Sequence, residues 1–214
     1  MSEIVKKESI SSILKKVEVR VFEKFEPILK AFGINKYPTQ LLLIAFKAEQ
    51  ILEMYAVFNN ATILIESYPF TGFSGTIGPK LKNGDKQIPE GIYSVEYLNP
   101  NSKFYLSIKI NYPNDFDREK ASLDGREDLG GDIFIHGKSN TTGCIPVGDE
   151  AMEEIFVLAA KADISKIKVI ICPQDFRKND QNPVIPQINW SEELYDNLKK
   201  ELGLRRCQTV ELTS

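Results

Sequence analysis

The chain is poor in the side chains that bind metal ions. Its 214 residues include one histidine and three cysteines, and Cys144, Cys172 and Cys207 lie far apart in the sequence. A structural zinc site needs several closely spaced Cys or His ligands, and a disulfide framework needs an even set of cysteines at regular spacings. We therefore expect no metal site, no disulfide framework and no cofactor.

One-sided charge and long apolar runs are also missing. The chain has 27 Lys and Arg against 30 Asp and Glu, for a net charge of -3, and it lacks a basic block of the kind that binds nucleic acid. No apolar run is long enough to cross a bilayer, so we expect no integral membrane segment. The N-terminus lacks the charged-then-apolar pattern of a signal peptide, which leaves open a cytoplasmic protein or a chain that begins after a removed signal.

What the chain does contain predicts a mainly β protein with helices at its edges, an α+β fold. Branched or alternating apolar residues between turn signals are typical of strands. They occur at residues 41–47, 51–58, 61–68, 91–98, 104–110, 131–136 and 166–172. The first three of these segments are expected to form a meander.

Helices are expected at both ends of the chain. An amphipathic period predicts one in the first thirty residues, carried by Ile10, Ile13, Leu14, Val17 and Val21. A second short helix is expected at residues 25–32, ended by Gly33. Further helices are expected to begin near Asp149 and to span residues 191–202, with Ser191 as the N-cap of the last one.

Two long polar segments connect these elements. The segment 111–130 is expected to be a functional or mobile loop. Within the Gly-rich segment 71–89, residues 75–80 resemble a phosphate loop only faintly, because they lack the Gly-Lys-Ser/Thr ending and a proline removes one backbone donor. We expect it to line a polar substrate through Ser74, Lys80 and Asp85, with ordinary turn chemistry as the alternative.

The single histidine lies close to a cysteine. His136 ends a predicted strand, Gly137 allows the chain to turn out of that strand, and seven residues intervene before Cys144. A loop of that length can return the thiol to the imidazole, and a Cys beside a charged His has a lowered pKa and greater nucleophilicity. Since imidazole titrates near neutral pH, this pair is the candidate catalytic centre.

The surroundings of the pair favour a functional interpretation over a core cysteine beside an incidental histidine. Gly143 allows close approach of a carbonyl, and the N–H groups of Gly143 and Cys144 are expected to form an oxyanion hole. Asp132 shares the strand face of His136, but four residues of strand span about 13 Å. We therefore expect a backbone carbonyl, or a residue from another segment, to hold the second ring nitrogen. Cys172 ends an apolar strand and is expected to be buried and inert.

The region from Ile135 to Phe156 resembles the catalytic motif of L,D-transpeptidases of the YkuD-like fold, in which a strand-borne His precedes Ser/Thr-x-Gly-Cys. The matching residues are His136-Gly137 and Thr141-Thr142-Gly143-Cys144. The spacing is shorter than in the commonest branch, and Thr142 stands where that branch has a second His. Both departures resemble the YafK-like branch, as do residues 73–80, 84–93, 112–117 and 143–150, and the resemblance covers residues 40–175.

This resemblance implies a YkuD-like β-sandwich catalytic domain and a bacterial cell-wall substrate in the periplasm or cell envelope. Cys144 would attack the carbonyl at the L-centre of diaminopimelate in a peptidoglycan stem peptide or peptidoglycan-linked protein. A thioester would form, and an amine or water would resolve it with His136 as base and acid. Hydrolysis of the same bond, acyl transfer to a protein amine, and a non-catalytic cell-wall binding module remain alternatives.

The resemblance also guides the choice of site residues and the division of the chain. We expect the catalytic residues to be Cys144, His136 and Gly143. The substrate-binding candidates are Ser74, Lys80, Thr141, Thr142, Gly137, Tyr112 and Asn114. The predicted division is an N-terminal helical segment at 1–38, the catalytic domain at 39–176, and a Pro-containing linker with C-terminal helix and tail at 177–214. The oligomeric state stays open.

Overall fold

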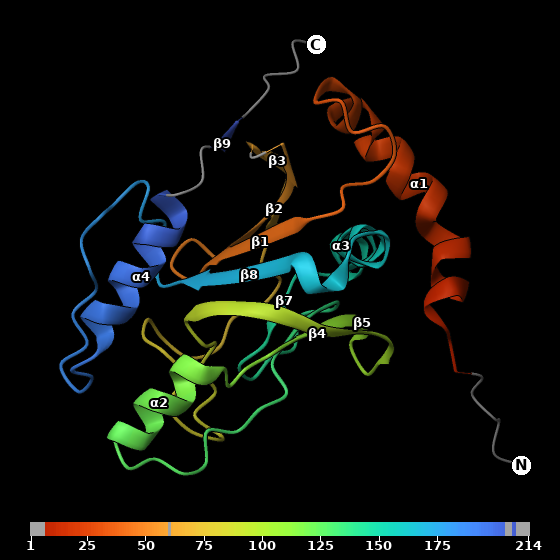
Figure 1. Ribbon diagram of the computed structural model, residues 1–214. Helices are drawn as coiled ribbons and strands as arrows, with labels where there is room; N and C mark the ends of the chain where they lie inside the picture. Colours follow the sequence, from red (N-terminus) through yellow and green to blue (C-terminus); the bar gives the residue numbers. More distant parts are fainter. Residues whose placement is uncertain (1–6, 60, 204–206, 209–214) are drawn as a thin grey trace, which may run out of the picture.

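The computed structural model describes residues 7–59, 61–203 and 207–208. Within these ranges the strands form one mixed sheet in the order β7-β6-β5-β4-β8-β1-β2-β3-β9, with helices packed against it (Figure 1). The predicted mainly β, α+β fold is confirmed. None of the described helices has both the length and the apolar character that a membrane span requires.

The bounds of the elements agree with most of the predicted segments. The strands are β1 (Leu41–Phe46), β2 (Ile51–Phe58), β3 (Ala61–Pro69), β4 (Gly91–Ser102), β5 (Tyr105–Ile110), β6 (Phe134–His136), β7 (Ile145–Pro146), β8 (Ile167–Cys172) and β9 (Cys207–Gln208). The helices are α1 (Ile10–Ala31), α2 (Asp115–Leu123), α3 (Asp149–Lys161), the 3-10 turn η1 (Ile164–Lys166) and α4 (Ser191–Gly203).

Strand β1 lies at the centre of three layers. All six of its residues are buried. Its side chains alternate between a core formed with α1 and α3 and a second core formed with α4, as expected for a strand covered on both faces. Figure 1 shows α1 and α3 on one side of the sheet and α4 on the other. A continuous apolar run in the sequence is the signature of this position.

Helix α1 is one continuous helix, so the prediction of a separate helix at 25–32 was wrong. Pro27 lies inside it, and an interior proline costs about 3 kcal/mol. Phe25 and Leu29, on either side of the proline, are buried in the main core together with Val21. Each such side chain contributes about 1.5–3 kcal/mol on burial, which outweighs the cost of the proline. The helix ends at Ala31 with Phe32 as its C-cap, and the next residue, Gly33, has a φ of +77°.

The prediction that residues 111–130 form a loop was also wrong, because the segment contains α2. Asn114 caps this helix: its Oδ1 accepts from the N–H of Asp117 at 2.9 Å, and the carboxylate of Asp117 accepts from the N–H of Asn114 at 3.0 Å. This reciprocal capping box satisfies backbone groups that a helix start leaves unpaired. The helix packs toward α4 through Phe116 and Trp190, whose ring centroids lie 6.0 Å apart.

The C-terminal region differs from the prediction in two details. Ser191 is the first residue of α4 instead of its N-cap, and its hydroxyl donates to the carbonyl of Ile188 at 3.0 Å. Within the predicted C-terminal tail, Cys207 and Gln208 form β9, which pairs in parallel with β3. Residues 1–6 of the predicted N-terminal segment, and 204–206 and 209–214 of the predicted C-terminal segment, lie outside the described residues.

A buried charged network ties the Gly-rich segment to the sheet. The ammonium of Lys47, which directly follows β1, lies 2.9 Å from the carboxylate of Glu90, and both side chains are fully buried. Lys47 also donates to the carbonyls of Gly78 and Ile88, and Glu90 accepts from the N–H of Gly78 and the hydroxyl of Tyr195 in α4. This network fixes the segment between β3 and β4, which reaches the site described below.

Replacing Lys47 by Met should lower the free energy of unfolding by about 3–5 kcal/mol, because the Glu90 carboxylate is left buried without its counter-charge. Adding Glu90→Gln to this variant should recover part of the loss, because the unpaired charge is then removed. Urea denaturation of the wild type and both variants measures this difference. A cost below about 1 kcal/mol for Lys47→Met would contradict the assigned role of the pair.

Candidate active site

Strand register brings the thiol and the imidazole to the same face of the sheet. In the parallel pair β6·β7, Ile135 lies opposite Ile145 and His136 opposite Pro146. Cys144, which directly precedes β7, therefore lies beside Phe134, whose N–H donates to its Sγ at 3.4 Å. His136 and Cys144 line one cavity of about 160 Å³ together with Phe104, Asn140, Thr141 and Thr142.

The imidazole of His136 is fixed by a backbone carbonyl, one of the two alternatives that the sequence analysis left open. Its Nδ1 lies 2.6 Å from the carbonyl oxygen of Gly137. A carbonyl only accepts, so Nδ1 carries the hydrogen and Nε2 keeps its lone pair. Nε2 is buried, and it has no hydrogen-bond partner in the described part of the chain. The ring of Phe104 packs on the imidazole with centroids 4.6 Å apart.

Burial determines the protonation states of the His136 imidazole and the Cys144 thiol. It lowers the pKa of His136 below its ordinary value, although the hydrogen bond to Gly137 opposes this shift. It also raises the pKa of the Cys144 thiol, against the smaller effect of the N–H of Phe134. The prediction of a lowered thiol pKa was therefore wrong. At neutral pH the site holds a protonated thiol and a neutral imidazole instead of an ion pair.

The thiol does not contact the imidazole directly. Its described hydrogen-bond partners are the N–H of Phe134 and the carbonyl of Asp132, to which it donates at 3.6 Å. The carboxylate of Asp132 points to Lys109, 3.2 Å away, and takes no part in holding His136. Proton transfer from Sγ to Nε2 therefore requires the thiol to turn from the Asp132 carbonyl into the shared cavity.

The expected oxyanion donors are engaged by hydroxyl groups. The N–H of Gly143 donates to Ser74 Oγ at 2.8 Å, and the N–H of Cys144 donates to Thr141 Oγ1 at 3.0 Å. Thr141 Oγ1 also donates to the carbonyl of Cys144 at 2.7 Å. The prediction of an open oxyanion hole is corrected accordingly: a substrate oxygen has to replace these hydroxyls before it can use either N–H group.

Gly143 is required by both its backbone and its surroundings. Its φ is +109°, and a Cβ there would lie 3.0 Å from the carbonyl oxygen of Gln87. Gly137 is confined as well, because a Cβ would lie 2.6 Å from the carboxylate of Asp149 and 2.8 Å from the carbonyl of Phe104. These two glycines let the chain turn tightly between the imidazole and the thiol.

A larger cleft opens on the other side of Cys144. Its volume is about 800 Å³, and Phe104, Thr142 and Cys144 line both this cleft and the small cavity. Lys86 and Lys103 line it as well, and neither forms an ion pair with a described carboxylate. Because unpaired cations in a cleft attract anionic ligands, the cleft is suited to an acidic substrate.

Two of the predicted substrate-binding residues support the site instead of facing a ligand. Ser74 holds the N–H of Gly143 as described above. The ammonium of Lys80 donates to the carboxylate of Asp85 at 2.6 Å and to the carbonyl of Lys82. Although burial opposes ionisation, the bonds from Lys80 and from backbone N–H groups lower the pKa of Asp85. Lys80 thus lines the cleft as part of a fixed turn.

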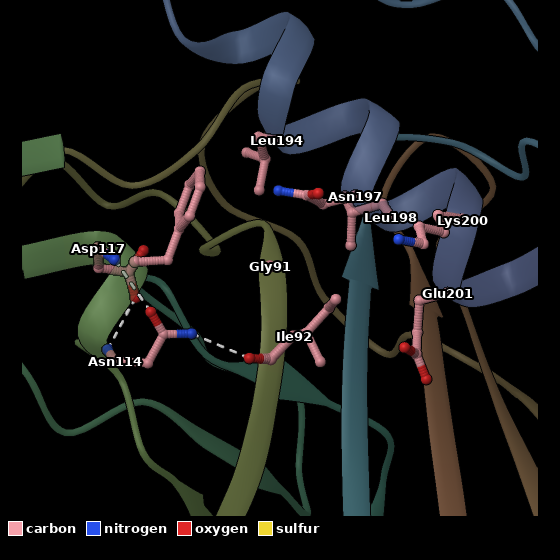
Figure 2. Close-up of a pocket in the computed structure, with 10 residues that line it drawn as sticks. Gly91, Ile92, Asn114, Asp117, Leu194, Asn197, Leu198, Lys200 and Glu201 are labelled. Carbon is pink, nitrogen blue, oxygen red and sulfur yellow. Dashed lines mark hydrogen bonds between the residues drawn. The ribbon is translucent and has the colours of Figure 1, made fainter. Parts of the chain in front are cut away.

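Tyr112 and Asn114, also predicted to bind substrate, do not line either space beside Cys144. Tyr112 is buried and its hydroxyl donates to the carbonyl of Leu129 at 3.1 Å. Asn114 caps α2 and donates to the carbonyl of Ile92 at 2.9 Å, in a separate pocket of about 280 Å³ between α2 and α4 (Figure 2). Both residues fix the position of α2.

Phe104 and Ser107 were not predicted as site residues. Phe104 covers the imidazole from the turn before β5, and Ser107 lies directly opposite His136 in the antiparallel pair β5·β6. A serine among the apolar residues of a strand is a weak signal. Its position opposite His136 depends on a register that the sequence does not reveal.

Alkylation by iodoacetamide should separate Cys144 from Cys172. Cys144 is accessible from two spaces, so it should react, at a rate that increases with pH up to a midpoint above 9.0, the ordinary thiol value. Cys172 is fully buried and should stay unmodified in the folded protein. Mass spectrometry resolves each cysteine. A Cys144 midpoint near neutral pH would show an ion pair and contradict the structure.

Thr141→Val should loosen the turn that presents Cys144, because the N–H of Cys144 loses its acceptor. The expected loss is about 1–3 kcal/mol of unfolding free energy, whereas Thr141→Ser should stay within about 1 kcal/mol of the wild type because it keeps the hydroxyl. Denaturant unfolding measures both. Equal stability of the Val and Ser variants would show that this hydroxyl does not hold the turn.

Comparison with known proteins identifies the family of the chain. Residues 42–171 match the YkuD family, described as the L,D-transpeptidase catalytic domain. The chain is 30% identical over 178 residues to YafK from Escherichia coli (strain K12), which carries the name of a candidate L,D-transpeptidase. This match covers 81% of the chain and 69% of YafK.

Solved structures show the same fold. The chain is similar to the helical cell shape determining protein Pgp2 from Campylobacter jejuni, with a TM-score of 0.52 and 21% identity to the K307A mutant. A second Pgp2 structure matches with a TM-score of 0.51 and 16% identity. The matches cover 78% and 87% of this chain, and the chain spans 56% and 79% of the two Pgp2 chains. With more than half of its length matched, the chain belongs to the YkuD family of L,D-transpeptidase catalytic domains.

Proposed function

We propose that this protein is a cysteine-dependent L,D-transpeptidase that acts on peptidoglycan stem peptides through a thioester on Cys144. The observation that carries the proposal is the neutral imidazole of His136. Its Nδ1 is fixed by the Gly137 carbonyl, and its basic Nε2 is buried without a described partner in the cavity that the thiol shares. Such an arrangement supplies a general base for a protonated nucleophile.

The first half-reaction uses the thiol and the imidazole in turn. The Cys144 proton moves to Nε2 as Sγ attacks the carbonyl carbon of the diaminopimelate L-centre, and a tetrahedral oxyanion forms. The N–H groups of Gly143 and Cys144 flank the nucleophile in the chain, and they serve the oxyanion once it replaces the Ser74 and Thr141 hydroxyls. The protonated imidazole then gives its proton to the leaving amine, and the thioester remains.

The second half-reaction runs the same steps in the opposite direction, with a new nucleophile in place of the leaving amine. A primary amine attacks the thioester carbon, Nε2 takes one of its protons, and the carbon–sulfur bond breaks. The proton returns to Sγ, which restores the thiol and releases an amide. The same imidazole serves both halves because the whole chain has one histidine.

The cleft supports the choice of substrate class. Stem peptides carry several carboxylates, and the exposed Lys86 and Lys103 offer cations to them, whereas the carboxylate of Asp132 in the same cleft is paired with Lys109. The family is named for this activity. We place the reaction in the periplasm or cell envelope, where such a substrate lies, and within the segment 39–176.

Hydrolysis of the same bond is the second candidate. The cavity on the imidazole side has a volume of only about 160 Å³, which admits water readily and restricts a bulky amine. In that case water replaces the amine in the second half-reaction, and a free acid leaves.

Incubation with a disaccharide-tetrapeptide should add the acyl mass to Cys144, and intact-protein mass spectrometry should detect it. Cys144→Ala should abolish the adduct, whereas Cys172→Ala should retain it because that thiol is buried in a core. Acylation should accelerate with pH around a midpoint below 6.5, since burial lowers the pKa of His136 and only the neutral imidazole is a base. An unacylated wild type would contradict the proposal. An amide product would indicate transfer, and a free acid would indicate hydrolysis.

A further inference from the structure

Two buried polar atoms of neighbouring strands lack a hydrogen-bond partner among the described residues. They are Oγ of Ser107 in β5 and Nε2 of His136 in β6. The two residues lie directly opposite each other in the antiparallel register, so their side chains project from the same face of the sheet with Cβ atoms about 4.5–5.5 Å apart. An unpaired buried hydroxyl costs about 1–3 kcal/mol, and an alanine in this strand would avoid that cost.

The position of the two atoms relates them to the thiol. Ser107 is 1% exposed and lines the large cleft, and His136 lines the small cavity. The two spaces share Phe104, Thr142 and Cys144, so they meet at Sγ. Ser107 and His136 therefore flank the region from which a second molecule approaches an acyl group held on Cys144.

An attacking amine or water needs two hydrogen-bond acceptors there. Its lone pair must point at the thioester carbon, and each of its hydrogens then points away from that carbon. Nε2 of His136 accepts the hydrogen that is transferred. A second acceptor orients the other hydrogen, and a serine hydroxyl with free lone pairs is suited to it.

We propose that Ser107 is a second contact of the acyl acceptor, a primary amine or water, and that it acts in resolution of the thioester. Its Oγ accepts the hydrogen that stays on the nucleophile while Nε2 takes the other. The carbon–nitrogen or carbon–oxygen bond forms, the carbon–sulfur bond breaks, and the transferred proton passes from Nε2 to Sγ. This inference rests on the proposed function. It adds that the site favours acyl acceptors whose attacking nitrogen or oxygen bears at least two hydrogens.

The test separates formation of the thioester from its decay. In Ser107→Ala, thioester formation should stay within about twofold of the wild type. Decay should slow at least about tenfold, the factor that a hydrogen bond of about 1.4 kcal/mol contributes to a rate. Ser107→Thr keeps the hydroxyl and should restore most of the decay rate. Thr62→Val, which removes a buried strand hydroxyl from β3, is the matched control and should leave both rates unchanged.

Acceptor preference provides a measurement that a change in packing alone would not alter. The wild-type thioester should react with D-alanine much faster than with N-methyl-D-alanine, which has only one amine hydrogen, and Ser107→Ala should lose most of this ratio. This comparison is made within each variant, so it holds even if Ser107→Thr packs poorly.

Three results would overturn the inference in distinguishable ways. If the thioester on Ser107→Ala decays at the wild-type rate and keeps the wild-type ratio of the rates with D-alanine and N-methyl-D-alanine, Ser107 has no such role. An equal loss of formation and decay, with the ratio kept, would assign Ser107 to packing. Absence of any thioester on the wild type would overturn the proposed function itself, and the inference with it, before any variant is compared.

Discussion

The hydrogen bond from Nδ1 of His136 to the carbonyl of Gly137 is the interaction on which the site depends. It fixes the tautomer and turns Nε2 toward the space shared with the thiol. Two hydrogen bonds hold the peptide group between His136 and Gly137. The N–H of Gly137 donates to the carbonyl of Leu106 in β5 at 3.1 Å, and the N–H of Val147 donates to the carbonyl of His136 at 2.9 Å. The proposed base is therefore positioned by the sheet, and no side chain is needed as a third member.

The thiol is positioned by a different part of the chain. Ser74 reaches Gly143 from the Gly-rich segment, and Thr141 holds both backbone groups of Cys144. That segment is in turn fixed by the buried ion pair of Lys47 and Glu90. Since the imidazole belongs to the sheet and the thiol to two tethered loops, the separation of the two groups can change on substrate binding without disturbing the core.

Much of the fold could be predicted from the sequence because its core strands are continuous or alternating apolar runs. The buried run of β1 and the amphipathic α1 are examples. Helix α2 was missed because its surface is polar, and only the Asn114 and Asp117 capping pair indicates it. Helix α1 was wrongly divided before residue 25, although its buried face continues from Val21 through Phe25 to Leu29.

The site was predictable only in part, for the same physical reason. His136 and Cys144 are close in sequence, so a short loop sufficed to bring them together. The stacking of Phe104 and the position of Ser107 depend on strand register, and the pKa of Cys144 depends on burial. None of these can be read from residue spacing. The pairing of a cysteine with a histidine in sequence predicted a lowered pKa for the Cys144 thiol, whereas burial raises it.

The central claim is that the resting site holds a neutral imidazole with its hydrogen on Nδ1. Because the chain has a single histidine, nitrogen NMR of the uniformly labelled protein reports on this residue alone. The account predicts the Nδ1–H tautomer at neutral pH and a titration midpoint below 6.5, the ordinary value. A positively charged imidazole at neutral pH, or a neutral ring with its hydrogen on Nε2, would contradict it.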